Sequence, residues 1–359
     1  VPLGWNTPLF QRFQHFSLQA GSLGGFSFYG APPMVDKIGL FRCINPNFHI
    51  FDATNVELTN ALIDFLTKRP ELKVVRIQSI DTVTKITDIE DFLRRGFSVV
   101  YEYIDEVTPQ ISGSIPQYVW ERHEWCKKDR RVLVVATSDK LYRQAITYRM
   151  ENILMLSNGV DVSHWRKFEH NDSVAPEKLN RVLRSGKTIV AYHGALAQWI
   201  DYELLSKIAA DGRYSLLLIG YQHDHTEACR KLLSHPNVYY IGPVPYQDLN
   251  RYTPFYDVAI MPFVLNDITL SVSPVKIFEY MAAGVPVVST ALPECKKYRS
   301  CLIGETHGEF LRKLALATLL REDGKYMKAL ETDANANTWC SIMEKMIEAV
   351  KLGCRKGMV

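Results

Sequence analysis

Short apolar runs rich in Val, Ile, Leu and Tyr alternate with longer amphipathic stretches along the chain. The runs are continuous rather than alternating, which is typical of parallel strands buried on both faces of a sheet. Helices between such strands give doubly wound, Rossmann-like α/β domains. We expect strands at 26–30, 48–54, 73–77, 97–105, 131–138 and 152–156, and then at 187–194, 215–220, 237–242, 257–263 and 285–290.

A polar stretch, residues 157–187, separates the two sets of strands, carries turn residues at both ends and contains no strand run. The chain of 359 residues also exceeds the length at which a single core usually stops growing. We therefore expect an N-terminal domain over 1–160, a linker over 161–187, a C-terminal domain over 188–333 and a last helix within 334–359.

Composition and charge narrow the classes of function. With 47% hydrophobic and 23% charged residues the composition is ordinary for a globular protein, and the net charge of +3 is too small to indicate nucleic acid. Aromatic and basic residues do not interleave as they do in platforms for single strands. The basic clusters at 127–131 and 351–356 predict solvated faces, with docking on an anionic membrane surface as the alternative.

The seven cysteines form no CxxC pair, and their number is odd. This argues against a disulfide framework or a structural zinc site and favours a reducing cytoplasm. No run of about eighteen apolar residues occurs, and the first residues lack the charged and apolar regions of a signal peptide. We expect a cytoplasmic protein that is peripheral to the membrane at most.

The segment SPVKIFEYMAAGVPVVST, residues 273–290, predicts a loop, a helix of about ten residues and a buried strand. Ser273 and Pro274 suit the N-cap and the first turn of a helix. Gly284 suits the position just after its end.

The start of this helix is a candidate anion site if it lies at the cleft where the carboxyl ends of two parallel sheets meet. Its free N–H groups favour a negative charge, and Ser271, Ser273 and Lys276 would surround a phosphate or diphosphate. Glu279 lies about one turn further on the same face, where a carboxylate can accept hydrogen bonds from a ribose diol. An ordinary ion pair between Lys276 and Glu279 on an exposed helix is the alternative.

Several segments together resemble the nucleotide-sugar glycosyltransferases of the GT-B fold, and most of all the retaining family 4 type and its relatives in bacterial cell-surface polysaccharide synthesis. These segments are PFVLNDITLSVSPVKIFEYMAAGVPVVST (262–290), SNGVDVSHW (157–165), AYHGALAQWIDYELL (191–205) and NVYYIGPVPYQDL (237–249). Residues 3–22 and 337–351 also resemble the N-terminal opening and the last helix of such proteins. The resemblance implies an N-terminal acceptor domain, a C-terminal donor domain and a last helix that returns to the N-terminal domain.

The resemblance also implies roles for residues on the donor side. Lys276 would neutralise the diphosphate of the leaving group, and Glu279 would bind the ribose. The other implied donor contacts are loop residues Thr269, Ser271 and Ser273 near the phosphates and the transferred sugar, Val244 and Tyr246 at the base, and Gly194 where the chain approaches the donor. The resemblance implies no metal. It also implies no cofactor, because the nucleotide sugar, with UDP, GDP or dTDP as its nucleotide, is a substrate.

The sequence departs from the family pattern at two places. Ser271 stands where many family 4 enzymes carry a Glu, and GALAQWID (194–201) lacks the Arg and Lys that they place after the glycine. Lys276 is therefore expected to take over the phosphate role. In the family an apolar strand also precedes the opening segment, so the first strand is expected to be missing or unusually short.

Two routes of catalysis follow from the resemblance. In a retaining enzyme without a protein nucleophile, a donor phosphate oxygen takes the acceptor's proton, and Lys276 is the side chain that matters most for the leaving group. An inverting enzyme needs a general base, for which Asp105 and Glu106, at the end of the strand 97–105, are candidates. Ordinary loop carboxylates are the alternative interpretation.

Other prominent residues have structural interpretations. His123 is a further candidate base, although we expect it to be packed or solvated. We expect Asp201 to support the start of a helix rather than to line the cleft, and Trp339 to pack the last helix. The group His223, Asp224 and His225 predicts a polar loop rather than a metal site, because no further ligand follows at a usual spacing.

The resemblance predicts transfer of a hexose or deoxyhexose to a saccharide or lipid-linked acceptor at the cytoplasmic face of the membrane. Two alternatives stay open: a nucleotide-sugar epimerase or hydrolase of the same fold, and a protein that binds nucleotide sugars without catalysis.

Overall fold

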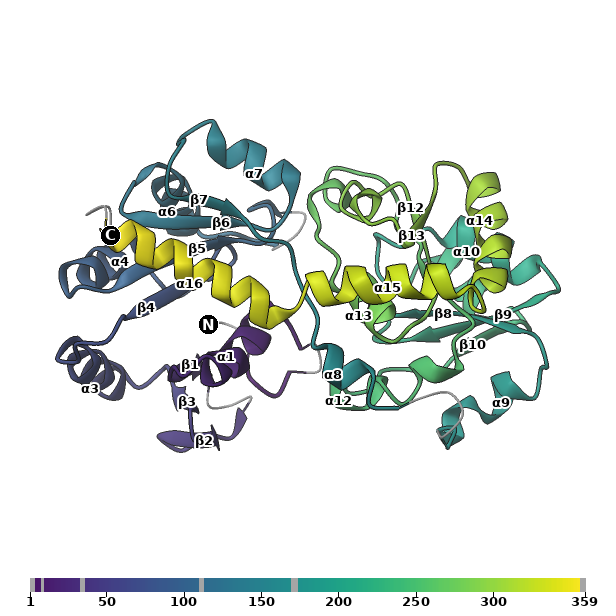
Figure 1. The fold of residues 1–359 in the computed structure, drawn as a ribbon, viewed down its shortest axis with the longest axis horizontal. Coiled ribbons are helices and arrows are strands. Elements are labelled where there is room, and N and C mark those ends of the chain that lie inside the picture. Colours follow the sequence, from purple (N-terminus) through teal and green to yellow (C-terminus); the bar gives the residue numbers. More distant parts are fainter. Residues whose placement is uncertain (1–3, 8–9, 33–35, 110–112, 169–173, 356–359) are drawn as a thin grey trace. The chain divides into compact units, whose positions relative to one another are not determined.

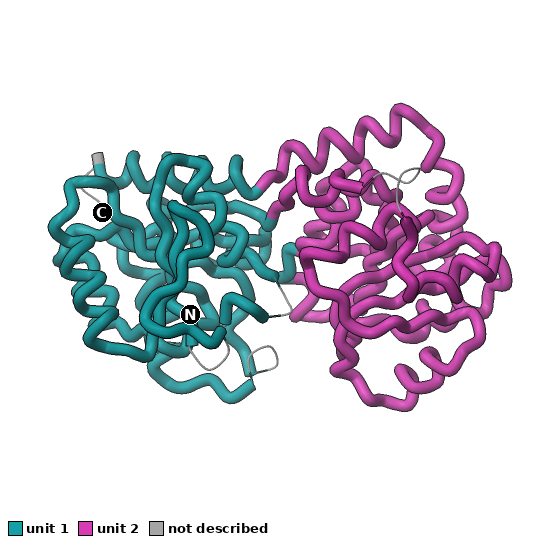
Figure 2. The backbone as a smooth tube through the Cα atoms, turned by 90° about the horizontal axis from the view of Figure 1, so that it is seen from below, with its two compact units in different colours: residues 1–158, 271–273, 339–359 teal, residues 159–270, 274–338 magenta. Residues whose placement is uncertain are grey.

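The computed structural model describes residues 4–7, 10–32, 36–109, 113–168 and 174–355. Its backbone forms two compact units (Figure 2). Unit 1 comprises Val1–Asn158, Ser271–Ser273 and Trp339–Val359, and unit 2 comprises Gly159–Leu270 and Pro274–Thr338.

Unit 1 contains a four-stranded parallel sheet in the order β4-β5-β6-β7 and a three-stranded sheet in the order β1-β3-β2 (Figure 1). The side chains of β5 and β6 are buried along both strands, which explains their continuous apolar runs. The strands are β1 (Ser27–Ala31), β2 (Phe41–Asn45), β3 (Phe48–Asp52), β4 (Val74–Gln78), β5 (Ser98–Tyr103), β6 (Val132–Ala136) and β7 (Ile153–Met155). The apolar pattern predicts six of them.

Strand β2 was not expected, and it corrects the prediction of wholly parallel sheets. It pairs antiparallel with β3, and its first three residues are exposed. An exposed edge strand needs no continuous apolar run, so the pattern does not reveal it.

The helices of unit 1 include α16, which packs against α1. Trp339, the first residue of α16, is buried and stacks on the His15 ring with a centroid distance of 4.7 Å, so its expected packing role is confirmed. The described helices are α1 (Arg12–Ser22), α3 (Val56–Thr67), α4 (Ile86–Arg94), α6 (Gln117–Lys128), α7 (Asp139–Ile146) and α16 (Trp339–Arg355).

Unit 2 is built on a six-stranded parallel sheet in the order β10-β9-β8-β11-β12-β13. The strand order reverses between β8 and β11, and ligands of such sheets bind outside the carboxyl ends of the strands at that point. The strands are β8 (Thr188–His193), β9 (Tyr214–Ile219), β10 (Val238–Tyr240), β11 (Val258–Met261), β12 (Val287–Thr290) and β13 (Cys301–Gly304). The last of these is a four-residue edge strand that the pattern does not predict.

Helices and short 3₁₀ turns connect these strands, and α10, α13 and α14 contact the sheet. The elements are α8 (Val162–Trp165), η1 (Glu177–Leu179), α9 (Asn180–Leu183), α10 (Tyr202–Ala210), α11 (Glu227–Leu233), α12 (Tyr246–Leu249), η2 (Thr253–Phe255), η3 (Thr269–Ser271), α13 (Val275–Ala282), η4 (Cys295–Lys297), α14 (His307–Leu320) and α15 (Gly324–Ala336). Trp165, from the polar segment between the two sets of strands, is buried in the core of unit 2. None of the described helices combines the length and apolarity needed to cross a bilayer.

Helix α13 has the start and end that its sequence predicts, with one correction. Pro274, not Ser273, occupies the cap position, and it makes no side-chain cap. Gly284 ends the helix with φ at 67°, and its N–H donates to the carbonyl of Met281. The helix is therefore bounded by a proline and a left-handed glycine.

Candidate functional site

Two glycines follow the central strands of unit 2. Gly194 comes directly after β8 and Gly220 directly after β9, and both have φ at 145°. A Cβ atom on Gly220 would lie 2.0 Å from the carbonyl oxygen of Gly194. A Cβ atom on Gly194 would lie 2.2 Å from Cε of Lys276. The Lys276 side chain thus crosses directly over a backbone that only glycine can provide.

Lys276 is the second residue of α13, and its side chain is half-buried. Within the described residues its ammonium group has no hydrogen bond and no ion pair, so the ordinary pair with Glu279 is absent. Burial lowers the pKa of Lys276, while the charge of Glu279 acts in the opposite direction. A partly desolvated cation without a partner is suited to an anionic ligand.

Glu279 lies one turn further along α13 and is only 6% exposed. Its Oε2 is 2.9 Å from Nε2 of His193, the last residue of β8. Oε1 makes no hydrogen bond within the described part of the chain. The carboxylate therefore has one oxygen held by the protein and one oxygen available.

Aromatic rings surround this carboxylate. The Tyr246 ring stacks on His164 with a centroid distance of 4.8 Å and meets Trp165 edge-on at 5.8 Å. Burial and the charge of Glu279 raise the pKa of Tyr246 well above its ordinary value. Since His164 covers one face of Tyr246, at most the other face is open to a nucleobase. Val244, on the loop after β10, is half-buried against the core.

The loop residues expected near the phosphates are engaged within the protein. The Thr269 hydroxyl donates to the carbonyl of Val264 at 2.5 Å and accepts from the N–H of Asn266 at 3.0 Å. Ser271 and Ser273 are buried and belong to unit 1. In unit 2, Lys276 lies against Gly194, and the charge of Glu279 acts on both Lys276 and Tyr246. Thr269 belongs to the same unit, whereas Ser271 and Ser273 are grouped with unit 1.

Ser273 has a defined role in unit 1. Its hydroxyl accepts from the backbone N–H of Asn158 at 3.1 Å, and its carbonyl accepts from the Asn158 side chain at 2.6 Å. Asn158 in turn accepts from the Arg12 guanidinium at 3.3 Å. These contacts fix the end of the loop that precedes α13.

Arg12 belongs to a buried charge cluster that sequence reasoning missed. Its Nε is 3.0 Å from Glu102 Oε1, and Nη2 of Arg76 is 2.6 Å from Glu102 Oε2. Burial lowers the pKa of Arg12 against the opposing charge of Glu102. No signal in the sequence connects Arg12 with Glu102, because 90 residues separate them.

Of the two candidate bases in unit 1, Asp105 alone is free. Its carboxylate has no hydrogen bond and no cation among the described residues, and burial raises its pKa to about 6. Glu106 forms an ion pair with Lys140 at 2.9 Å and accepts from Gln144 at 3.0 Å. Asp105 is therefore suited to proton transfer near neutral pH, whereas Glu106 is held as an acceptor.

Two further predictions concern His123 and the polar residues 223–225. His123 is packed, because its Nδ1 meets the Tyr101 hydroxyl at 2.6 Å and burial lowers its pKa to about 3. Residues 223–225 lie in a loop in which the Asp224 carboxylate accepts from the N–H of Thr226 at 2.8 Å. In the described ranges, no cluster of three or more His, Cys, Asp or Glu side chains could hold a metal ion.

Of the two basic clusters, the one at 127–131 is largely paired with carboxylates. Lys127 contacts Glu124 at 2.5 Å, and Arg131 contacts Asp129 at 2.6 Å. In the C-terminal cluster, Lys351 is exposed, whereas the side chain of residue 355 and the whole of residue 356 lie outside the described residues.

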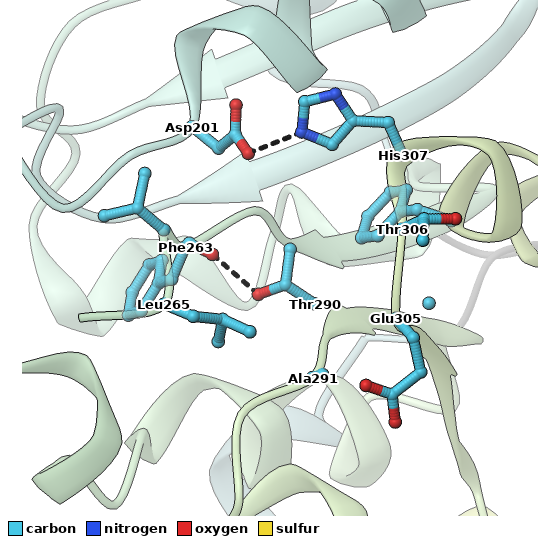
Figure 3. A pocket seen from close by; sticks show the side chains of 11 residues that line it. Asp201, Phe263, Leu265, Thr290, Ala291, Glu305, Thr306 and His307 are labelled. Carbon is cyan, nitrogen blue, oxygen red and sulfur yellow. Dashed lines mark hydrogen bonds and ion pairs between the residues drawn. The ribbon is translucent and has the colours of Figure 1, made fainter.

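A separate pocket of about 180 Å³ opens at the carboxyl ends of β11, β12 and β13 (Figure 3). On one side, Nε2 of His307 meets Asp201 Oδ2 at 2.8 Å. On another, the Thr290 hydroxyl donates to the carbonyl of Phe263 at 2.7 Å. Asp201 also accepts from the N–H of Leu204, so its expected support of the start of α10 is confirmed.

The comparisons with known proteins come from both sequence and structure. Residues 187–315 match the family model described as glycosyl transferases group 1. A putative teichuronic acid biosynthesis glycosyltransferase, TuaH of Bacillus subtilis (strain 168), is 27% identical over 177 residues. This match covers 48% of the chain and 43% of TuaH, so it spans less than half of either protein.

Two solved structures share the fold. Anabaena HepE in complex with UDP has a TM-score of 0.57 at 13% identity, over 84% of this chain and 85% of that one. HepE has also been solved with UDP-glucose. WaaG, a glycosyltransferase involved in lipopolysaccharide biosynthesis, has a TM-score of 0.60 at 12% identity, over 94% and 95% of the two chains. At these identities the likeness establishes the fold, which is GT-B as predicted.

Proposed function

We propose, from the match of residues 187–315 to the glycosyl transferases group 1 family model, that the chain transfers a sugar from a UDP-sugar donor to a saccharide or lipid-linked acceptor. The observation that carries the proposal is the unpaired Lys276 above Gly194, one helical turn from the available carboxylate oxygen of Glu279. A cation followed by a carboxylate acceptor suits the diphosphate and the ribose of one nucleotide. The presence of UDP in the complex of HepE, which shares the fold, supports the choice of base.

The chemistry of the proposed reaction follows from the bond that breaks. Cleavage of the anomeric C–O bond moves negative charge onto the diphosphate and positive charge onto the sugar. The ammonium of Lys276 and the N–H groups at the start of α13 stabilise this developing negative charge, because both are fixed before the reaction begins. Lys276 contributes to catalysis only as far as it binds the leaving diphosphate more tightly than the intact donor.

The stereochemical course is proposed to be retention. A donor phosphate oxygen then takes the proton of the acceptor hydroxyl, and no protein base is needed. Asp105 is the candidate base for the inverting alternative, because burial raises the pKa of its carboxyl to about 6, close to neutral pH. The two courses are distinguished by the anomeric configuration of the product, which NMR reads directly.

The transferred sugar is proposed to be a hexose or deoxyhexose, and the acceptor a saccharide or lipid-linked intermediate of bacterial surface polysaccharide synthesis, presented at the inner face of the membrane. The similarity to TuaH over 177 residues and the fold shared with WaaG support this choice, since the names of both refer to cell-surface glycans. The expectation of a peripheral membrane location is part of the same proposal.

Calorimetric titration of UDP, GDP and dTDP into the wild type and Lys276→Ala, without added metal, tests the donor assignment. We expect saturable binding of UDP that Lys276→Ala weakens at least tenfold, with weaker binding of the other two nucleotides. Equal binding to both proteins would refute the phosphate role of Lys276. Turnover of UDP-glucose without any acceptor would favour a hydrolase or epimerase, and binding without turnover on any acceptor extract would favour a noncatalytic protein.

A further inference from the structure

Among the described residues, His193 is the one whose side chain hydrogen-bonds the carboxylate of Glu279, a candidate donor ligand. We propose that His193 is a positioning residue, whose Nε2–H orients the Glu279 carboxylate so that Oε1 receives the hydroxyls of the donor ribose. This inference rests on the proposed function, which supplies the nucleotide. It goes beyond that function because His193 is not among the donor contacts that the resemblance implies, and it lies outside the helix motif of residues 273–290.

The ring of His193 is fixed from several sides. The residue is 2% exposed and ends β8, and its backbone N–H donates to the Tyr280 hydroxyl at 3.0 Å. Trp165 stacks on the ring with centroids 5.5 Å apart and an interplanar angle of 10°. The Tyr280 ring also packs against it at 4.5 Å. A ring that cannot turn presents its Nε2 in one direction only, toward Glu279.

The hydrogen-bonding partners determine the tautomer. Glu279 can only accept, so the proton lies on Nε2, and Nδ1 is buried without a hydrogen-bond partner. Burial lowers the pKa of His193, the hydrogen bond to Glu279 opposes this, and the charge of Lys276 lowers it further. A ring that is neutral at neutral pH directs the carboxylate without cancelling its charge. The negative charge therefore stays available for the ribose hydroxyls.

Glu279 depends on this contact because its other neighbours do not bond it. Lys276 lies one turn away on the same helix but forms no ion pair with Glu279 in the described structure. Within the same residues, the His193 contact at 2.9 Å is the one hydrogen bond of the carboxylate. Without the hydrogen bond from His193, the Glu279 carboxylate would rotate among several orientations, and part of the affinity for the ribose would be lost.

The test compares binding of UDP with binding of 2′,3′-dideoxy-UDP, which lacks the ribose hydroxyls. The variants are His193→Gln, whose amide N–H reaches the position of Nε2, and His193→Asn, whose amide is one methylene shorter. His193→Phe keeps the stacking and removes the donor. His123→Phe is the matched control, because it replaces another buried, hydrogen-bonded histidine outside the donor site.

We expect the wild type to bind UDP about tenfold more tightly than the dideoxy analogue, as for a hydrogen bond to a charged group. His193→Phe and His193→Asn should lose this preference while their affinity for the analogue stays the same. His193→Gln and His123→Phe should keep it. Thermal unfolding of each variant identifies any that fail to fold. If His193→Phe fails to fold, the comparison of His193→Gln with His193→Asn still tests the inference.

The possible failures are distinguishable. A wild type that does not bind UDP overturns the proposed function and this inference together. If the wild type prefers UDP and all three His193 variants keep that preference, the inference alone is wrong. If every His193 variant weakens both ligands equally, the role of His193 is structural and the inference is also wrong.

Discussion

Replacement of Lys276 by Met separates ligand binding from protein stability. Met has a similar length and no charge, so it can follow the same path over Gly194. Because the Lys276 ammonium has no partner in the described structure, its removal leaves no other group unpaired. The variant should therefore fold normally and lose only the contact with a ligand.

The magnitudes follow from this geometry. A hydrogen bond between charged groups contributes about 1.5–3 kcal/mol, so UDP affinity should fall by roughly 10- to 150-fold. The free energy of unfolding should stay unchanged or rise by about 1 kcal/mol, because an unpaired, half-buried cation has been replaced by an apolar side chain. Lys276→Met should therefore lower UDP affinity without lowering the free energy of unfolding.

The dependence on pH gives a second signature. Burial lowers the pKa of Lys276, so between its folded and unfolded pKa values the unfolded chain binds more protons. Wild-type stability should therefore rise with pH in that window, while UDP affinity falls as Lys276 loses its proton. Neither change should occur in Lys276→Met.

Calorimetry with UDP and urea denaturation, both from pH 7 to 10, measure these quantities. Lys328→Met is the control, since Lys328 is exposed on α15 and pairs with Glu331 at 2.7 Å. It should change neither UDP binding nor its pH dependence. Unaltered UDP affinity in Lys276→Met, or a loss of stability above about 2 kcal/mol, would refute the reasoning, because the lysine would then have a structural partner.

Three other substitutions test the surroundings of the site. Gly220→Ala should destabilise by about 2–4 kcal/mol in urea, because its Cβ meets the backbone oxygen of Gly194 at a positive φ; a stable variant would contradict this geometry. The wild type should gain at most about 3 kcal/mol of stability as pH falls from 7 to 4, because the Asp105 carboxyl takes up its proton at a higher pH in the folded state than in the unfolded state. Asp105→Asn should remove this gain. If the stability of wild type and variant depends on pH in the same way, the raised pKa of about 6 is excluded. Arg12→Met should cost about 3 kcal/mol in the same assay, because buried Glu102 loses one of its two cations, and a neutral effect would show that Arg76 suffices.

The sequence is most informative where a local pattern decides the structure. Strands β8 and β9 are predicted because their continuous apolar runs require burial on both faces. Helix α13 is predicted because Pro274 and Gly284 bound it locally. The edge strands β2 and β13 escape prediction, because the first three residues of β2 are exposed and β13 has only four residues, two of them incompletely buried.

Contacts across the chain are not predictable in this way. The spacing of Lys276 and Glu279 suggests an ion pair, yet Glu279 bonds a histidine 86 positions earlier. A histidine at the end of an apolar strand is the only sequence signal of that contact. The resemblance implies that Thr269 lies near the phosphates, but it does not reveal that the Thr269 hydroxyl donates to the carbonyl of Val264 in its own loop.

The departures from the family pattern explain the arrangement around Lys276. Residues 195–201 contain no Lys or Arg, so this stretch supplies no cation. The proposed diphosphate requires a cation, and the Lys276 side chain lies directly over Gly194, next to the stretch that lacks one. Removal of the Lys276 charge should therefore reduce UDP affinity without compensation from a neighbouring cation.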